Sequence, residues 1–196
     1  MDIYMFRLIN NLANKSETLN YLGVFTAKYT VYILALVMVI LWFAKRNDFQ
    51  TRKMLIIATL SCVLSELVGK LVAGHIYFHK QPFAVLSGVN KLISKNIGNS
   101  FPSDHTIVFF SIMVIFFIYF KSKLRYLFPV LAIIVGISRI FVGVHYPIDI
   151  FVGASIGTII SIISYIYLNN SKFIVKIINL TYKVENKFFN WNMISN

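Results

Sequence analysis

Two segments of the chain contain the residue types needed to transfer a phosphoryl group to a side chain. Asp149 follows His145 by four residues, so its carboxylate can reach one ring nitrogen of His145 and leave the other nitrogen free as a nucleophile. A second histidine, His105, could protonate the leaving oxygen and later activate water. Arg139 carries a planar guanidinium group that pairs well with phosphate oxygens. These residues indicate nucleophilic catalysis on a phosphate group, with His145 as nucleophile and His105 as general acid.

The residues before His105 predict a helix start that could bind phosphate. Pro102 favours the first turn of a helix, and Ser103 or Asp104 can cap it. Such a start presents free backbone N–H groups and the positive end of the helix dipole. A third polar group precedes these segments and contains Lys70, His75, His79, Lys80, Gln81 and Pro82.

Each of these residues also has an ordinary structural explanation. A single histidine at a helix end is usually a hydrogen-bonded polar side chain, Arg139 could be a membrane anchor, and Asp149 could cap a helix. The structural explanation is preferred for His75 and His79 as loop residues, for Glu66 as a partner of Lys70, and for Lys91 and Lys95 as solvated lysines. For the others, the convergence of histidine, arginine, serine and aspartate at three predicted helix ends favours catalysis.

The composition indicates that these residues sit in a membrane protein. Hydrophobic residues make up 58% of the 196 residues and charged residues 13%, against about 45–50% and 25% in soluble domains. The mean hydropathy is +0.72. The net charge of +12 could suggest nucleic acid, but the basic residues flank hydrophobic runs, where they set topology and attract anionic lipids. The single cysteine, Cys62, excludes an intrachain disulfide and a multi-cysteine metal site.

The expected fold is an all-α polytopic membrane helix bundle in a single domain, 1–196. Each span needs roughly 20 residues, and five segments qualify: 22–44, 54–73, 103–120, 126–141 and 147–168. An interfacial helix is expected within 1–21. The tail 169–196 is expected to be a basic amphipathic helix, with Lys172, Lys176, Lys183 and Lys187 among apolar residues.

The basic loops predict the topology. The segments 45–53, 121–125 and 169–196 are rich in lysine and arginine, and with five spans they fall on one side of the membrane. The positive-inside rule assigns that side to the cytoplasm. The N-terminus, the loop 74–102 and the turn 142–147 then face outward, and the candidate site lies on that face.

At this point the chain resembles a known family. Ser138-Arg139, five residues, His145, three residues and Asp149 match the third motif of the phosphatidic acid phosphatase type 2 superfamily. Pro102-Ser103-Asp104-His105 is similar to its second motif, usually Pro-Ser-Gly-His. The runs SFPSDHT and GISRIFVGVHYPID resemble most closely the bacterial undecaprenyl-diphosphate phosphatases of the bacitracin-resistance type.

The resemblance implies a role for each motif residue. His145 would become phosphohistidine, Asp149 would orient it, and His105 would be the general acid. Ser103 and Arg139 would bind phosphate, with Asp104 beside them. No metal and no other cofactor is implied, because cationic side chains and backbone N–H groups supply the positive charge.

The first motif departs from the family pattern. That pattern is Lys, six residues, Arg-Pro, and counting back from Pro82 places Gln81 at the arginine position and Gly74 at the lysine position. Gln81 can donate hydrogen bonds to phosphate but has no charge. Lys80 and Lys70 are therefore the candidates to restore the positive charge.

The resemblance implies hydrolysis of undecaprenyl diphosphate to undecaprenyl phosphate and inorganic phosphate, which would recycle a cell-wall carrier lipid and give bacitracin tolerance. The implied partners are this polyprenyl diphosphate and membrane lipids, with no nucleic acid and no obligate protein partner, in a bacterial plasma membrane. One alternative is a phosphatase for phosphatidate or phosphatidylglycerophosphate, or one of broad specificity. Another is a non-catalytic lipid-phosphate-binding or transport protein, which the departure at Gln81 keeps open.

Overall fold

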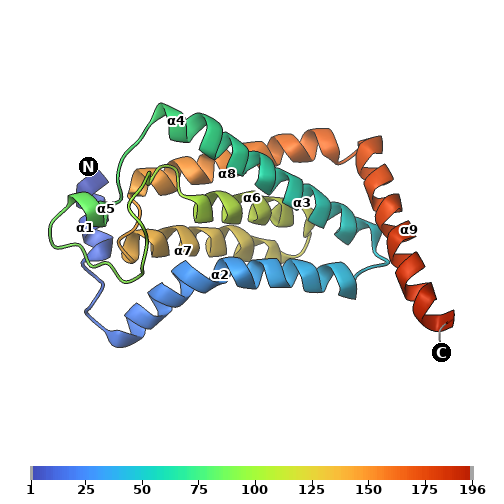
Figure 1. Ribbon diagram of the computed structural model, residues 1–196, viewed down its shortest axis with the longest axis horizontal. Helices are drawn as coiled ribbons and strands as arrows, with labels where there is room; N and C mark the ends of the chain where they lie inside the picture. The colour runs from blue at the N-terminus through green and yellow to red at the C-terminus, as the bar shows by residue number, and fades with distance from the viewer. Residues whose placement is uncertain (1, 195–196) are drawn as a thin grey trace.

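The fold is a helical bundle with a polar loop region at one end and a crossing helix at the other (Figure 1). The structure is a computed structural model that describes residues 2–194, with side chains to residue 187, so Met1 of the expected interfacial helix and residues 195–196 of the expected tail lie outside it. The helices are α1 (Asp2–Asn10), α2 (Glu17–Ala44), α3 (Phe49–Val68), α4 (Gly74–Ile76), α5 (Pro82–Val85), α6 (Asp104–Tyr119), α7 (Leu127–Phe141), α8 (Pro147–Leu168) and α9 (Lys172–Ile194). A π-helical turn, Gly69–Ala73, joins α3 to α4, and a 3-10 turn, Lys123–Tyr126, precedes α7. The described residues contain no strand, and the all-α membrane bundle is confirmed.

Four helical segments are long and apolar enough to cross a membrane, and a fifth apolar helix is shorter. The four are Glu17–Ala44, Phe49–Ile76, Lys123–Phe141 and Pro147–Leu168. The fifth, α6, has 16 residues and is about 24 Å long at 1.5 Å per residue, less than the roughly 30 Å of a bilayer core. The helix α6 packs against α3, α7 and α8 and is the most enclosed of the apolar helices along its length. The protein is a multi-pass membrane protein.

Close contact between α6 and α8 places the starts of these two helices together. A Cβ atom on Gly153 would lie 3.0 Å from the Ser103 carbonyl oxygen, and one on Gly157 would lie 2.9 Å from that of Ile107. Small residues of this kind allow helix backbones to approach closely in a membrane. The Ser103 N–H also donates to the carbonyl oxygen of Asp149 (3.2 Å). The motif residues at the two helix starts are therefore neighbours.

The opposite end of the bundle is basic and is covered by α9 (Figure 1). Ile174 and Ile178 are fully buried on the inner face of α9, whereas its lysines at 172, 176, 183 and 187 are exposed. Arg52 is fully buried and forms an ion pair with Glu185. The expected amphipathic character of the tail is thus seen in α9, although one face packs on the bundle instead of on lipid.

The N-terminal boundary differs from the expected one. α1 ends at Asn10, and α2 begins at Glu17 instead of Leu22. Ser16 has extended backbone and starts the longer helix. Phe6 and Asn10 of α1 are fully buried, so the first helix packs on the protein at the end where α5 and the 86–103 loop lie (Figure 1).

Candidate active site

A cavity of about 470 Å³ opens at the end of the bundle that holds α1 and α5. Its wall has an apolar part, mainly from α2 and the loop before α6, and a charged part from the loop, α6 and α7. The residues that line it are Val24, Ala27, Lys28, Tyr32, Leu92, Ile93, Ser94, Lys95, Asp104, His105, Arg139 and His145. The cavity can therefore hold a molecule with an anionic head and an apolar tail.

His145 lies in the turn between α7 and α8, and Asp149 in the first turn of α8. The Nδ1 atom of His145 is 3.3 Å from Oδ2 of Asp149, and both residues are buried. Oδ2 also accepts hydrogen bonds from the Tyr146 N–H (2.9 Å) and the Ser100 hydroxyl. The carboxylate is thus fixed by the helix start, as the spacing predicts.

The environment keeps the His145 ring neutral. Burial lowers the pKa of His145 to about 4, outweighing the hydrogen bond to Asp149, which raises it. A neutral imidazole has one N–H and one lone pair. With the N–H on Nδ1 facing Asp149, the lone pair is on Nε2, and His145 lines the cavity. This is the tautomer that a nucleophilic histidine needs.

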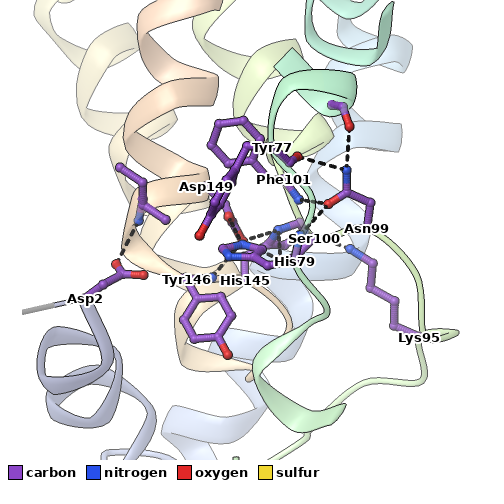
Figure 2. A network of polar contacts seen from close by, with 12 residues as sticks. Asp2, Tyr77, His79, Lys95, Asn99, Ser100, Phe101, His145, Tyr146 and Asp149 are labelled. Atoms are coloured by element: carbon purple, nitrogen blue, oxygen red, sulfur yellow. Dashed lines mark hydrogen bonds and ion pairs between the residues drawn. The ribbon is translucent and has the colours of Figure 1, made fainter. Parts of the chain in front are cut away.

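Lys95 occupies the position in front of that lone pair. Its Nζ atom lies 2.8 Å from Nε2 of His145, and Figure 2 shows its side chain extending from the loop toward the ring. An ammonium group has donors only, so Nε2 is the acceptor, in agreement with the tautomer above. Burial, followed by the charge of Arg139, lowers the pKa of Lys95 to about 8. The interpretation of Lys95 as a solvated lysine is wrong, since it is half-buried and lines the cavity.

His79 holds the other oxygen of the Asp149 carboxylate. Its Nε2 atom is 2.7 Å from Oδ1, and its ring packs against Tyr77 and Tyr146 at centroid distances of 4.9 and 4.8 Å. Figure 2 shows these groups around the carboxylate. Sequence reasoning preferred a loop role for His79, and no spacing rule connects it with Asp149, because 70 residues separate them.

Arg139 and His105 complete the charged wall. Arg139 is only 4% exposed, and its Nη1 donates to the Ala27 carbonyl oxygen. Its buried Nε has no hydrogen-bond partner in the described part of the chain. His105 is half-buried in the first turn of α6, and the exposed Asp104 lies beside it. Arg139 therefore places a buried cation at the cavity wall beside His105 and His145.

The other predicted phosphate ligands lie outside this wall. Ser103 is fully buried, and its Oγ accepts a hydrogen bond from Thr106 (3.1 Å). Lys70 forms the expected ion pair with Glu66 (3.0 Å). Lys80 is exposed, and Gln81 is buried with Oε1 accepting from the Gly98 N–H (3.0 Å). The structure brings Arg139, His105, Asp104 and His145 together at the cavity, but not Ser103, Lys70, Lys80 or Gln81.

The described residues include no group of three or more His, Cys, Asp or Glu side chains placed to hold a metal ion. The arrangement at the cavity includes a histidine whose Nε2 lone pair faces Lys95, a second histidine, and the cationic side chains of Lys28, Lys95 and Arg139. This set can bind a phosphate group, attack it and protonate a leaving oxygen.

Comparisons with known proteins agree with this chemistry. The family model described as PAP2 superfamily matches residues 55–173. The Bacillus licheniformis protein named bacitracin transport permease protein BcrC is 42% identical over 95% of this chain and 90% of its own. Undecaprenyl-diphosphatase BcrC of Bacillus subtilis is 26% identical over 97% of this chain and 94% of its own. The crystal structure of Aquifex aeolicus LpxE has a TM-score of 0.67 and 28% identity, covering 85% of this chain and 95% of that one.

Proposed function

The chain belongs to the PAP2 superfamily, and on that premise we propose that it hydrolyses undecaprenyl diphosphate to undecaprenyl phosphate and inorganic phosphate. The observation that carries the proposal is the lone pair of His145 Nε2 at a cavity that Arg139, Lys95 and His105 also line. The substrate class is supported by the name of the Bacillus subtilis relative, an undecaprenyl-diphosphatase that aligns over nearly the full length of both chains.

The first step transfers the terminal phosphoryl group to His145. The Nε2 lone pair forms a bond to the terminal phosphorus, and the bond from phosphorus to the bridging oxygen breaks. His105 gives its proton to that oxygen, which leaves as the lipid monophosphate. The His145 ring becomes cationic, and the buried carboxylate of Asp149, 3.3 Å from Nδ1, stabilises the positive charge.

The second step releases inorganic phosphate. A water molecule gives one proton to His105 while its oxygen forms a bond to phosphorus. The bond from phosphorus to Nε2 breaks, and its electron pair returns to the ring. Arg139 stabilises the negative charge on the phosphoryl oxygens in both steps, since it lines the cavity and its guanidinium group is largely removed from water. His105 ends protonated, ready for the next cycle.

The apolar wall of the cavity offers a path for the prenyl chain. Val24 and Tyr32 of α2 and Leu92 and Ile93 of the loop line this side, and much of α2 exposes apolar side chains to the surroundings. A polyprenyl chain can lie along this face in the bilayer while its diphosphate enters the cavity. The lipid class fits the shape and polarity of the site.

The site is proposed to face the outside of a bacterial plasma membrane, with the C-terminus in the cytoplasm. The basic loops and α9 lie at the end of the bundle opposite the cavity (Figure 1). The positive-inside rule assigns that basic end to the cytoplasm. Hydrolysis of the diphosphate at the outer leaflet would remove the lipid form that accumulates there and give bacitracin tolerance.

The test is phosphate release from undecaprenyl diphosphate by purified protein in detergent, with and without EDTA, for the wild type and His145→Ala. We expect activity in the wild type with EDTA, none in the variant, and a trapped phosphohistidine in the wild type alone. Phosphatidate and phosphatidylglycerophosphate are assayed in parallel, and a higher kcat/KM for either would reassign the substrate. Equal hydrolysis by His145→Ala would refute the mechanism.

A transport role is the second candidate, because the Bacillus licheniformis relative is named a transport permease. Transport that uses the same cavity without chemistry predicts that His145→Ala keeps bacitracin tolerance in cells and that no phosphohistidine forms. Hydrolysis predicts that this variant loses tolerance at unchanged protein abundance. One set of strains therefore separates the two functions.

A further inference from the structure

Gln81 stands where the family pattern has an arginine, and its side chain binds the backbone of the loop before α6. It is 2% exposed, and its Oε1 accepts a hydrogen bond from the backbone N–H of Gly98 (3.0 Å). The neighbouring backbone of Lys80 pairs with Asn99. Gln81 therefore fixes the loop before α6 and leaves the cavity without the cation expected from the first motif.

The same loop brings a different cation into the cavity. Of the lysines considered for this role, Lys70 is paired with Glu66 and its side chain is 63% exposed, and Lys80 is exposed. Neither lines the cavity, whereas Lys95 does. We propose that Lys95 replaces the missing arginine as a phosphate ligand, and that its ammonium group moves from His145 Nε2 to an oxygen of the terminal phosphate when the lipid binds. This inference rests on the proposed function.

The hydrogen bond between Lys95 and His145 must break before His145 can react. Nε2 must lose its hydrogen bond before it can attack phosphorus, and Nζ lies 2.8 Å from it. A phosphate placed for attack has its oxygens next to the same position, so rotation about the lysine side-chain bonds is sufficient. The ammonium group exchanges one acceptor for a charged one, which makes a stronger hydrogen bond. Among the described residues, Lys95 is the one hydrogen-bond partner of Nε2 that must move away.

The loop holds Lys95 at this position through contacts on both sides. On one side, the Asn90 N–H donates to Asn10 (3.0 Å) and the Leu92 N–H to the Val142 carbonyl oxygen (3.2 Å). On the other, Gly98 is bound to Gln81. Because the backbone is fixed before and after Lys95, its ammonium group is available without ordering the loop during the reaction. Gln81, which replaces the arginine of the family pattern, thus anchors the same loop that places Lys95 at the cavity.

The charge of Lys95 is suited to this role. With a pKa of about 8 in the free protein, it is mostly protonated at neutral pH. Arg139 disfavours that charge, while Asp104 and Asp149 favour it. An incoming phosphate adds negative charge and strengthens the protonated form. Lys95 and Arg139 can then share the charge that develops on the phosphoryl oxygens.

The test compares Lys95→Met, Lys95→Arg, Lys70→Met and Lys80→Met, with Lys123→Met, an exposed lysine at the opposite end of the bundle, as the control. We expect Lys95→Met to lose about 10²–10³-fold in kcat/KM, the usual loss for one group that stabilises transition-state charge. Lys95→Arg should keep activity within about tenfold and move the alkaline limb of the pH profile upward, because guanidinium stays charged. The other three variants should match the wild type.

Binding of orthovanadate, measured by titration calorimetry in detergent, tests the ligand role without turnover. It should weaken at least about tenfold in Lys95→Met and stay near wild type in Lys95→Arg, and the same difference should persist in the His145→Ala background. Wild-type binding by Lys95→Met, or a larger loss in Lys70→Met or Lys80→Met, would overturn the assignment. If the wild type hydrolyses no lipid but binds orthovanadate through Lys95, the proposed function fails while the ligand assignment stands.

Discussion

Replacing Asp149 by asparagine removes the negative charge and keeps the shape of the side chain. The surrounding hydrogen-bond donors determine which side the amide oxygen occupies and which side the NH2 group occupies. Oδ2 accepts from the Tyr146 N–H and the Ser100 hydroxyl, whereas the hydrogen-bond partner of Oδ1 among the described residues is His79. The amide NH2 would be repelled by the Tyr146 N–H, so it must take the Oδ1 side and donate to His79. The amide oxygen then stays near Nδ1 of His145, and the nucleophilic tautomer is preserved.

The expected loss in Asp149→Asn is therefore electrostatic. The ring becomes cationic during phosphoryl transfer, and the carboxylate oxygen lies 3.3 Å from Nδ1. Two unit charges about 4 Å apart attract by about 4 kcal/mol at an effective dielectric constant of about 20. At 1.36 kcal/mol per factor of ten, kcat should fall about 10³-fold. The thermal stability should change little, because the helix-start acceptor for Tyr146 remains.

The assay is phosphate release at saturating undecaprenyl diphosphate, with rapid-quench measurement of phosphohistidine. Asp149→Asn should form the intermediate slowly, because the charge acts when the cationic ring forms. Asp149→Ala serves as the comparison, since it also removes the acceptor of Tyr146 and should lower the melting temperature. If Asp149→Asn kept more than about a tenth of wild-type kcat, corresponding to a loss below about 1.4 kcal/mol, the electrostatic role of the carboxylate would be refuted.

Two further predictions concern pH and stability. The kcat/KM should fall below about pH 4, where His145 takes a proton and loses its lone pair. Because Lys95 loses its charge above about pH 8, the wild type should lose more activity between pH 8 and pH 10 than Lys95→Arg does, and identical alkaline profiles for the two would contradict the role of Lys95. Replacing Glu185 by alanine leaves the buried Arg52 without its ion-pair partner, which should destabilise the protein by about 2–4 kcal/mol, allowing for the partial exposure of Glu185. Thermal unfolding in detergent measures this loss, and Glu185→Gln should recover part of it. An unchanged melting temperature in Glu185→Ala would show that α9 is held by its apolar face alone.

Much of the fold could be predicted because the bilayer limits the choices. Long apolar runs indicate the helices directly, but they do not mark where a helix begins. The helix α2 starts at Glu17, ahead of its apolar run, and Ser16 before it makes no side-chain capping hydrogen bond. For α6, by contrast, the predicted span 103–120 lies within one residue of the observed Asp104–Tyr119 at each end. Hydrophobic pattern and caps thus predict which segments are helical better than where each one ends.

The candidate site was predictable where its residues stand at the predicted helix ends, as His105 and Arg139 do, or where helical spacing links them. Asp149 follows His145 by four positions, and one helical turn brings them together. Lys95 and His79 reach the same site through the irregular loops around α5. The conformation of that region depends on contacts such as Asn10 with Asn90, 80 residues apart, and no periodicity encodes them. This is why Lys95 was interpreted as a solvated lysine and His79 as a loop or interface residue.

His79 offers a test of whether such a loop residue acts on the chemistry or only on packing. His79→Phe keeps an aromatic ring against Tyr77 and Tyr146 but removes the 2.7 Å hydrogen bond to Oδ1 of Asp149. The carboxylate then holds the His145 ring less firmly, and kcat should fall about tenfold, the equivalent of one net hydrogen bond. His75→Phe, at an exposed position on the same segment, is the matched control and should retain wild-type kcat.

The pH profile separates the two explanations for a loss in His79→Phe. Without His79, more of the negative charge of Asp149 is available to His145, so the pKa of His145 should rise and the acid limb of kcat/KM should move to higher pH. His79→Gln can still donate to Oδ1 of Asp149, so it should show nearly wild-type kcat and an acid limb of kcat/KM at the wild-type pH. A rate loss with an unmoved acid limb would mean that His79 contributes packing alone. A shifted limb would make His79 a positioning residue, acting on the nucleophile through the far oxygen of Asp149.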